Sequence, residues 1–129
     1  MKRIFLAFLF SLMASSSFAQ DVKAVYHVNT GVETVAAILA NITNHLNAAP
    51  KDKIVVVTHG PGIDFLINDA KDSKGREFSG QVSALAARGV VFDVCNNTLQ
   101  SRKIDPGNLL METKIVPSGV AEVARPAGG

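Results

Sequence analysis

The segment KIVVVTHGPG, residues 53–62, gives the strongest indication of how this chain folds. Its first part, KIVVVT, is a nearly continuous β-branched run, which is typical of a strand that is buried on both faces of a parallel sheet. The sequence His-Gly-Pro-Gly then breaks the strand, and the apolar residues 63–67 predict a short helical segment directly after the turn.

Strand and helix signals alternate along the rest of the chain. A capping box formed by Thr30 and Glu33 is predicted to begin the first helix, and Gly89 is predicted to end the second. Strands that alternate with helices across short turns indicate a mostly parallel sheet covered on both faces. We therefore predict one α/β domain, a three-layer α/β/α sandwich with a four- or five-stranded, mainly parallel sheet. The expected strands are residues 22–28, 53–58, 90–94 and 114–116, and a last helix begins within Pro117-Ser118-Gly119 and runs through Ala124. The apolar stripe of the first helix is Val32, Val35, Ala36, Leu39, Ile42 and Leu46.

The first nineteen residues have the features of a cleaved signal peptide. Lys2 and Arg3 precede a short apolar run, and small residues occupy Ser17 and Ala19, the positions that a signal peptidase reads. The apolar run is shorter than the roughly 20 residues that a membrane-spanning helix needs. We expect residues 1–19 to be removed, residues 20–129 to form the domain without a membrane span, and the protein to be periplasmic.

The charge of the expected mature chain argues against a nucleic-acid partner. The whole chain has 13 Lys and Arg against 11 Asp and Glu, and the signal peptide takes two of the basic residues. A balanced chain with one Tyr and no Trp has no basic, aromatic surface pattern for nucleic acid.

Polar residues gather where the predicted strands end. Because open parallel sheets bind ligands at the carboxyl ends of their strands, this rim is the candidate site. The only cysteine, Cys95, ends the third strand, so no internal disulfide is possible. From the pattern alone Cys95 is either a buried, inert thiol or a reactive one. Its expected neighbours at the rim are the candidate binding residues His59, Gly60, Asn96, Asn97 and Ser118.

Three stretches resemble the DsrE/DsrF-like family of sulfur-relay proteins: KIVVVTHGPGIDFLI at 53–67, RGVVFDVCNNTL at 88–99 and VPSGVAEVA at 116–124. The resemblance implies an α/β/α sandwich that associates as a trimer or hexamer. It also implies that Cys95 carries sulfur as a persulfide, which it takes from a donor protein and passes to an acceptor thiol without a metal or organic cofactor.

Other readings of the same residues stay open. The rival function is a non-catalytic oligomeric module that binds a small ligand or a partner protein at the rim. Gly60 and Gly62 could form an anion-binding turn, although they match no phosphate-loop pattern. A metal site of His27, His59 and Cys95 lacks chelating spacing, and a hydrolase triad of Ser118, His59 and Asp93 lacks a nucleophile elbow. For Ser118, a helix N-cap is the simpler interpretation.

Overall fold

A computed structural model describes residues 22–125 of the chain. The expected signal peptide, residues 1–19, lies outside the described residues, as do residues 20–21 and 126–129. Within residues 22–125, no helix combines the length and the apolar character that crossing a membrane requires.

A four-stranded parallel sheet forms the centre of the domain. Its strands are β1 (Lys23–Val28), β2 (Lys53–Thr58), β3 (Val91–Cys95) and β4 (Thr113–Val116), and they lie side by side in chain order. Every neighbouring pair is parallel, so all the carboxyl ends meet at one rim. The predicted strands are confirmed, with starts that differ by at most one residue.

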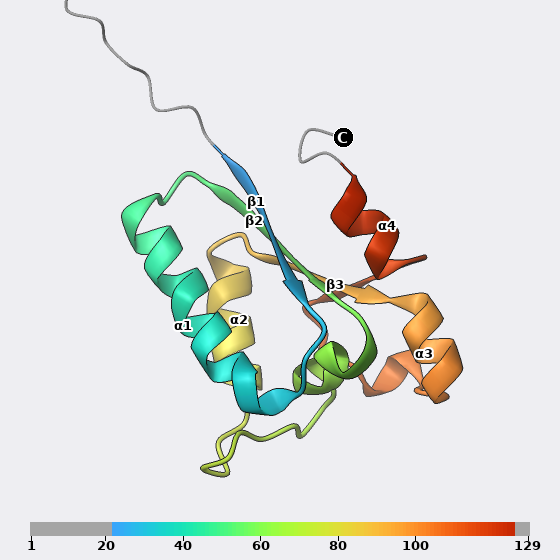
Figure 1. Cartoon of the computed structure of the whole chain (residues 1–129). Helices are drawn as coiled ribbons and strands as arrows, with labels where there is room; N and C mark the ends of the chain where they lie inside the picture. The colour runs from blue at the N-terminus through green and yellow to red at the C-terminus, as the bar shows by residue number, and fades with distance from the viewer. Residues whose placement is uncertain (1–21, 126–129) are drawn as a thin grey trace, which may run out of the picture.

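Helices cover both faces of this sheet. Figure 1 shows α1 (Val32–Ala48) and α2 (Ser79–Ala87) together on one side and α4 (Gly119–Ala124) on the other. The short helices η1 (Gly60–Leu66), α3 (Asn96–Arg102) and η2 (Pro106–Asn108) complete the connections. The α/β sandwich is therefore confirmed, and among the described helices the layer that contains α4 is the thinner one.

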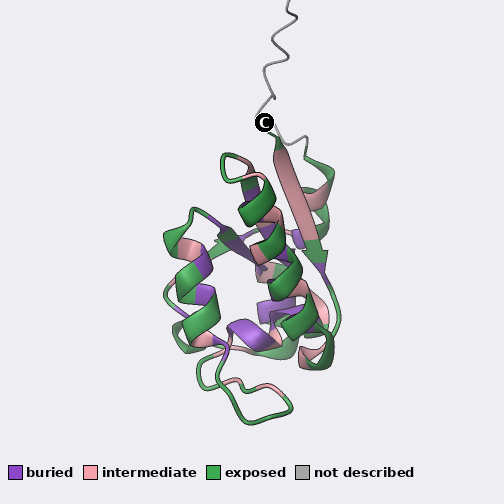
Figure 2. Cartoon of the chain, turned by 90° about the vertical axis from the view of Figure 1, so that its left-hand side faces the viewer, coloured by how far each residue is buried: buried purple, intermediate pink, exposed green. Residues whose placement is uncertain are grey.

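The main core lies between the sheet and the pair α1 and α2. Figure 2 shows the buried segments of these elements turned inward and their exposed segments outward. Phe65 and Phe92 meet edge to face in this core with ring centroids 6.2 Å apart. Complete burial of one such side chain contributes about 1.5–3 kcal/mol. The strand residues on this face are Val28, Ile54, Val56, Phe92 and Val94, and α1 adds Val35, Leu39, Ile42 and Leu46.

Three local predictions are wrong. The capping box does not form, because the Thr30 hydroxyl pairs with that of Thr34 at 2.6 Å and Gly31 becomes the N-cap without a side-chain cap. Ala36 is exposed, so the buried stripe of α1 is narrower than the sequence predicts. The helical segment after β2 begins at Gly60 rather than at residue 63 and is a 3-10 helix.

Candidate functional site

Cys95 lies at the rim, as the sequence predicts. It is the last residue of β3 and the N-cap of α3, and its side chain is only 4% exposed. The next residues turn directly into α3, so the amide groups of the first helical turn face the end of the strand. The thiol is therefore both buried and surrounded by backbone donors.

Helix α4 brings its first residue against Cys95. A Cβ atom placed at Gly119 would lie 3.2 Å from the Cβ atoms of both Cys95 and His59, and 3.3 Å from the carbonyl oxygen of Thr58. No larger residue fits there without movement, since ordinary carbon contacts are about 3.5–4.0 Å. The ends of β2 and β3 and the start of α4 therefore meet at one point.

The hydrogen-bond donors around Cys95 lower the pKa of its thiol more than burial raises it. Burial raises the pKa of the Cys95 thiol, but the amide N–H of Gly119, the hydroxyl and amide N–H of Thr98, and the amide N–H of Asn97 together bring this pKa below its ordinary value. The Cys95 side chain makes no capping hydrogen bond of ordinary geometry. These groups are thus oriented donors that can close on the sulfur when it ionises.

Thr98 links the thiol to the neighbouring turn. Its hydroxyl oxygen accepts a hydrogen bond of 2.9 Å from the amide N–H of Gly60. The hydroxyl proton is therefore free to point at Cys95, which agrees with the direction in which Thr98 shifts the pKa of Cys95. Thr98 is itself buried, so its position is fixed by packing.

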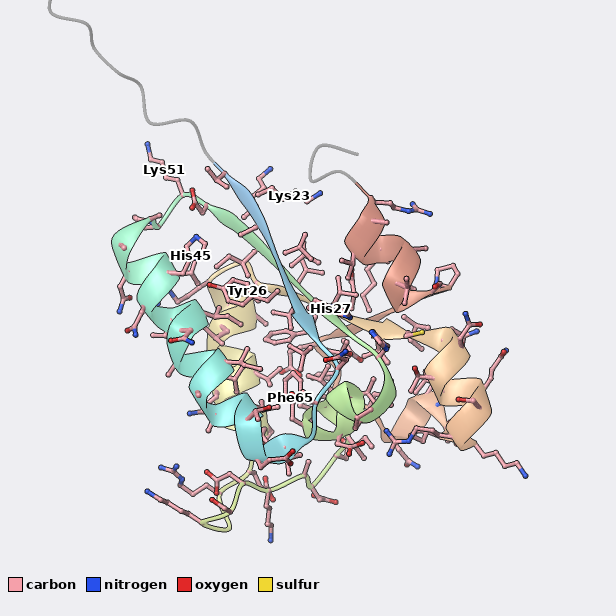
Figure 3. All side chains as sticks on the ribbon, viewed as in Figure 1. Lys23, Tyr26, His27, His45, Lys51 and Phe65 are labelled. Carbon is pink, nitrogen blue, oxygen red and sulfur yellow. The ribbon has the colours of Figure 1, made fainter. Side chains whose placement is uncertain are left out.

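His59 is paired with a second histidine. The Nε2 atoms of His27 and His59 are 2.5 Å apart, and the two rings stack with centroids 4.6 Å apart. Burial lowers the pKa of His59, and the nearby His27 lowers it further. Figure 3 shows His27 on β1, close to the carboxyl end of the sheet. Both effects favour the neutral form of the His59 ring, which lies beside the start of α4.

The other expected binding residues have more local roles. The Ser118 hydroxyl accepts from the amide N–H of Ala121 at 3.3 Å, so Ser118 is the N-cap of α4. Asn96 is half-buried and Asn97 is exposed; the structure shows no side-chain hydrogen bond from either to another described residue. Of the two, Asn97 contributes to the thiol only through its backbone.

The turn after β2 is not an anion cradle. The amide N–H of Gly60 is used by Thr98, and that of Gly62 donates to the carbonyl of His59 at 3.0 Å. Gly60 has a φ of +55°, which favours glycine, and its carbonyl accepts from Arg102. Gly62 is required for a different reason: a Cβ there would lie 2.0 Å from the carbonyl oxygen of Val28.

Neither alternative chemistry is assembled at the rim. The Ser118 hydroxyl caps a helix and the recorded partner of the His59 ring is His27, so no hydrolase triad with Asp93 forms. Among residues 22–125 there is no group of three or more His, Cys, Asp or Glu side chains placed to hold a metal ion. The candidate site is thus a single thiol with its donors.

Sequence reasoning missed two contributors to this site. Gly119 was visible only as part of a turn, because its approach to Cys95 depends on how α4 packs across β2 and β3. Sequence reasoning considers His27 with His59 only as part of a metal site, and the pairing of the two rings depends on the register in which His27 lies opposite Val57. No local pattern in the sequence encodes either contact.

Comparison with known proteins shows which family has this parallel α/β fold and rim cysteine. The chain belongs to the DsrE/DsrF-like family, whose family model matches residues 2–127. Among solved structures it is similar to MTH1491 from Methanobacterium thermoautotrophicum, a protein of unknown function, with 31% identity and a TM-score of 0.72 over 81% of this chain and 90% of that one. The ychN protein from E. coli has the same fold, with a TM-score of 0.64 at 15% identity over 81% of this chain and 89% of that one. No curated protein matched the chain.

Proposed function

We propose that this protein handles sulfur by carrying a sulfane sulfur atom as a persulfide on Cys95. The observation that supports this most is the set of donors from Gly119, Thr98 and Asn97, which favours the thiolate of Cys95 even though burial opposes it. The thiolate is the nucleophilic form of cysteine, and the donors favour it over the thiol. Membership of the DsrE/DsrF-like family supports the same chemistry.

The proposed step is a transfer of sulfur without net oxidation. The Cys95 thiolate attacks the outer sulfur of a donor persulfide, a bond forms between Sγ and that sulfur, and the S–S bond of the donor breaks. The donor leaves as a thiolate and takes up a proton. An acceptor thiolate then attacks the outer sulfur on Cys95 and restores the original thiol. Sulfur donor and acceptor proteins are the partners that this cycle requires.

Access to the sulfur depends on α4. Cys95 is 4% exposed and Gly119 lies against it, so movement of the start of α4 would uncover this side of the residue. The helix is short, and the Ser118 hydroxyl caps its first turn. Short helices of this kind derive little stability from their own backbone hydrogen bonds. We propose that α4 opens to admit a persulfide and closes over the loaded cysteine.

We further propose that the chain works as an exported homo-oligomer, a trimer or hexamer, in the periplasm. The N-terminal sequence described above supports export. For assembly, the support is a group of large apolar side chains left open beside the edge strand β4: Met111 is 92% exposed, Ile115 42% and Val120 64%. An unprotected edge strand with apolar neighbours favours association with another chain.

The burial of Cys95 favours a second candidate function. A thiol that is only 4% exposed packs like a small apolar residue, as free cysteines commonly do. The family fold would then act as a non-catalytic oligomeric module that binds a small ligand or a partner protein at the rim, with His59 and Asn97 among its accessible polar groups.

Intact-mass measurement separates the two functions. The folded protein is incubated with glutathione persulfide, and the masses of the wild type and of Cys95→Ser are compared. A carrier gains about 32 Da, one sulfur atom, on the wild type and nothing on the variant. If the folded wild type stays unmodified while the urea-unfolded chain gains the same mass, the thiol is inert in the fold and the binding module is the correct function.

A further inference from the structure

The face of the sheet that carries α4 is only partly covered. A groove of about 630 Å³ lies beside α4 at the amino ends of the strands, which is the opposite end of the sheet from the rim with Cys95. Cavities of about 300–1,000 Å³ are the usual size of small-molecule sites. Cys95 and His59 do not line this groove, so it is separate from the thiol site.

The strand register determines which charged and apolar side chains lie side by side on the groove floor. Lys23 and Lys53 are partners across β1 and β2 at one end of the floor. Two residues further along the same strands, Val25 pairs with Val55, and Val55 pairs with Val91, which makes an apolar row. These residues share one face because side chains alternate along a strand. The groove floor thus has the ammonium groups of Lys23 and Lys53 at one end and a row of valine side chains next to them.

Further cations surround the opening of the groove. Lys51 follows α1, Arg88 follows α2, Lys114 comes from β4, and Arg125 follows α4. The acidic lining residues are fewer: Asp52, Asp93 and Glu122. Figure 3 shows Lys23 and Lys51 at the same end of the sheet, well away from His27. The lining therefore has a positive balance that favours an anionic ligand.

A buried polar atom marks the other end of the floor. Asp93, which pairs with Lys114 across β3 and β4, is 4% exposed, and its Oδ1 atom is buried with no hydrogen-bond partner among the described residues. Burial raises the pKa of Asp93; Lys114 acts against this, Glu122 adds to it, and Lys23 again opposes it. A buried carboxyl oxygen without a partner is costly, and a hydroxyl or N–H group of a ligand would satisfy it.

We propose that this groove is a binding site for a small organic anion with an apolar body. Its carboxylate, sulfonate or phosphate group lies between Lys23 and Lys53, and its body covers the row of valines. A polar group of the ligand forms a hydrogen bond with Asp93. The site is distinct from the thiol site, since Cys95 does not line the groove, and Glu122 of α4 forms part of its lining.

A pair of matched fluorescent probes tests the proposal on the purified full chain. Anilinonaphthalene sulfonate has an anionic group, an aromatic body and an N–H donor, and N-phenyl-1-naphthylamine is the same molecule without the sulfonate. The proposal predicts saturable binding of the sulfonate at one site per chain, much weaker binding of the neutral probe, and loss of affinity for the sulfonate alone as salt is added. Equal binding of the two probes, or binding of neither, would overturn the proposal.

Two charge reversals locate the site. Lys53→Glu changes an exposed side chain at the groove, and Lys74→Glu makes the same change in the distant exposed loop. The first variant is expected to weaken sulfonate binding by about tenfold, the size expected when an attractive pair near the surface becomes repulsive. The second is expected to leave it unchanged. Circular dichroism confirms that both variants are folded.

A second copy of the chain is the competing occupant. Sedimentation of the wild type and of Val55→Lys distinguishes the two, because Val55 is on the groove floor. If the wild type is an oligomer that Val55→Lys dissociates, and the sulfonate does not bind the wild type, the face is a subunit interface and the ligand proposal is wrong. If the assembly state is unchanged and Val55→Lys abolishes probe binding, the ligand site is supported.

Discussion

Replacing Gly119 with alanine tests whether α4 holds the Cys95 site together. The new methyl group would lie 3.2 Å from the Cβ atoms of Cys95 and His59. Ordinary carbon contacts are about 3.5–4.0 Å, so α4 has to move outward by a few tenths of an ångström. Overpacking of this kind costs about 1–3 kcal/mol. We expect the free energy of unfolding of Gly119→Ala to fall by an amount in that range.

The same movement changes the chemistry of the thiol. The amide N–H of Gly119 is the strongest of the donors that lower the pKa of Cys95. A hydrogen bond to a charged group contributes about 1.5–3 kcal/mol, and 1.36 kcal/mol corresponds to one pH unit. If only part of that interaction is lost, the pH of half-maximal alkylation of Cys95 rises by about one in Gly119→Ala.

The assay is the rate of alkylation by iodoacetamide from pH 5 to pH 10, together with urea unfolding. Gly80→Ala is the matched control, because Gly80 lies in the first turn of α2 and a Cβ there would meet nothing within 4 Å. The control is expected to keep the wild-type pH profile and to be as stable or slightly more stable. If Gly119→Ala behaves like Gly80→Ala in both measurements, the arrangement of α4 over Cys95 is wrong.

Three further substitutions test the fold around the site. Ser118→Ala removes the N-cap of α4 and is expected to lower the free energy of unfolding by about 1 kcal/mol, measured in urea; no change would mean that the cap is not formed. Phe92→Ala empties a fully buried position in the core and is expected to cost about 3–5 kcal/mol in the same measurement; a cost near zero would contradict the packing of β3. Asp52→Asn tests a hydrogen-bonded chain in which the Asp52 carboxylate meets His45 at 2.9 Å. The bond to His45 lowers the pKa of Asp52, and the amide N–H of Val22 adds to this, so the interaction stabilises the fold above the ordinary pKa of Asp, about 3.9, and is lost as the pH falls through the lowered pKa. The wild type is therefore expected to be more stable than Asp52→Asn at pH 7, and the two should converge near pH 2; an equal difference at both pH values would refute this role.

The sheet could be predicted from the sequence because its strands are strong local signals. The run KIVVVT of β2 and the run VVFDV before Cys95 are mostly β-branched or aromatic residues, and glycine or proline lies in the turns that follow β2 and precede β3. Parallel pairing then follows from the alternation of strands and helices, and it places Cys95, His59 and Ser118 at one rim.

The parts that could not be predicted depend on tertiary contacts. The sequence NNTLQSR of α3 begins with three weak helix formers, and tertiary contacts support the helix, since Leu99 is buried and the Thr98 hydroxyl accepts from the amide N–H of Gly60. The predicted capping box is lost to a hydroxyl pair that involves Thr34, which the pattern rule does not consider. The approach of Gly119 to Cys95 could not be predicted either, since only the packing of α4 against the sheet determines it.

The return of sulfur from Cys95 to another thiol tests the proposed function most directly. The wild type is first loaded with persulfide, freed of the donor, and then mixed in its folded state with one equivalent of a small acceptor thiol while its intact mass is followed. A carrier loses the added sulfur, about 32 Da, and the acceptor appears as its persulfide in equal amount. A loaded protein that keeps its sulfur under these conditions, or one that never takes it up, would contradict the proposal that Cys95 passes sulfur from one thiol to another.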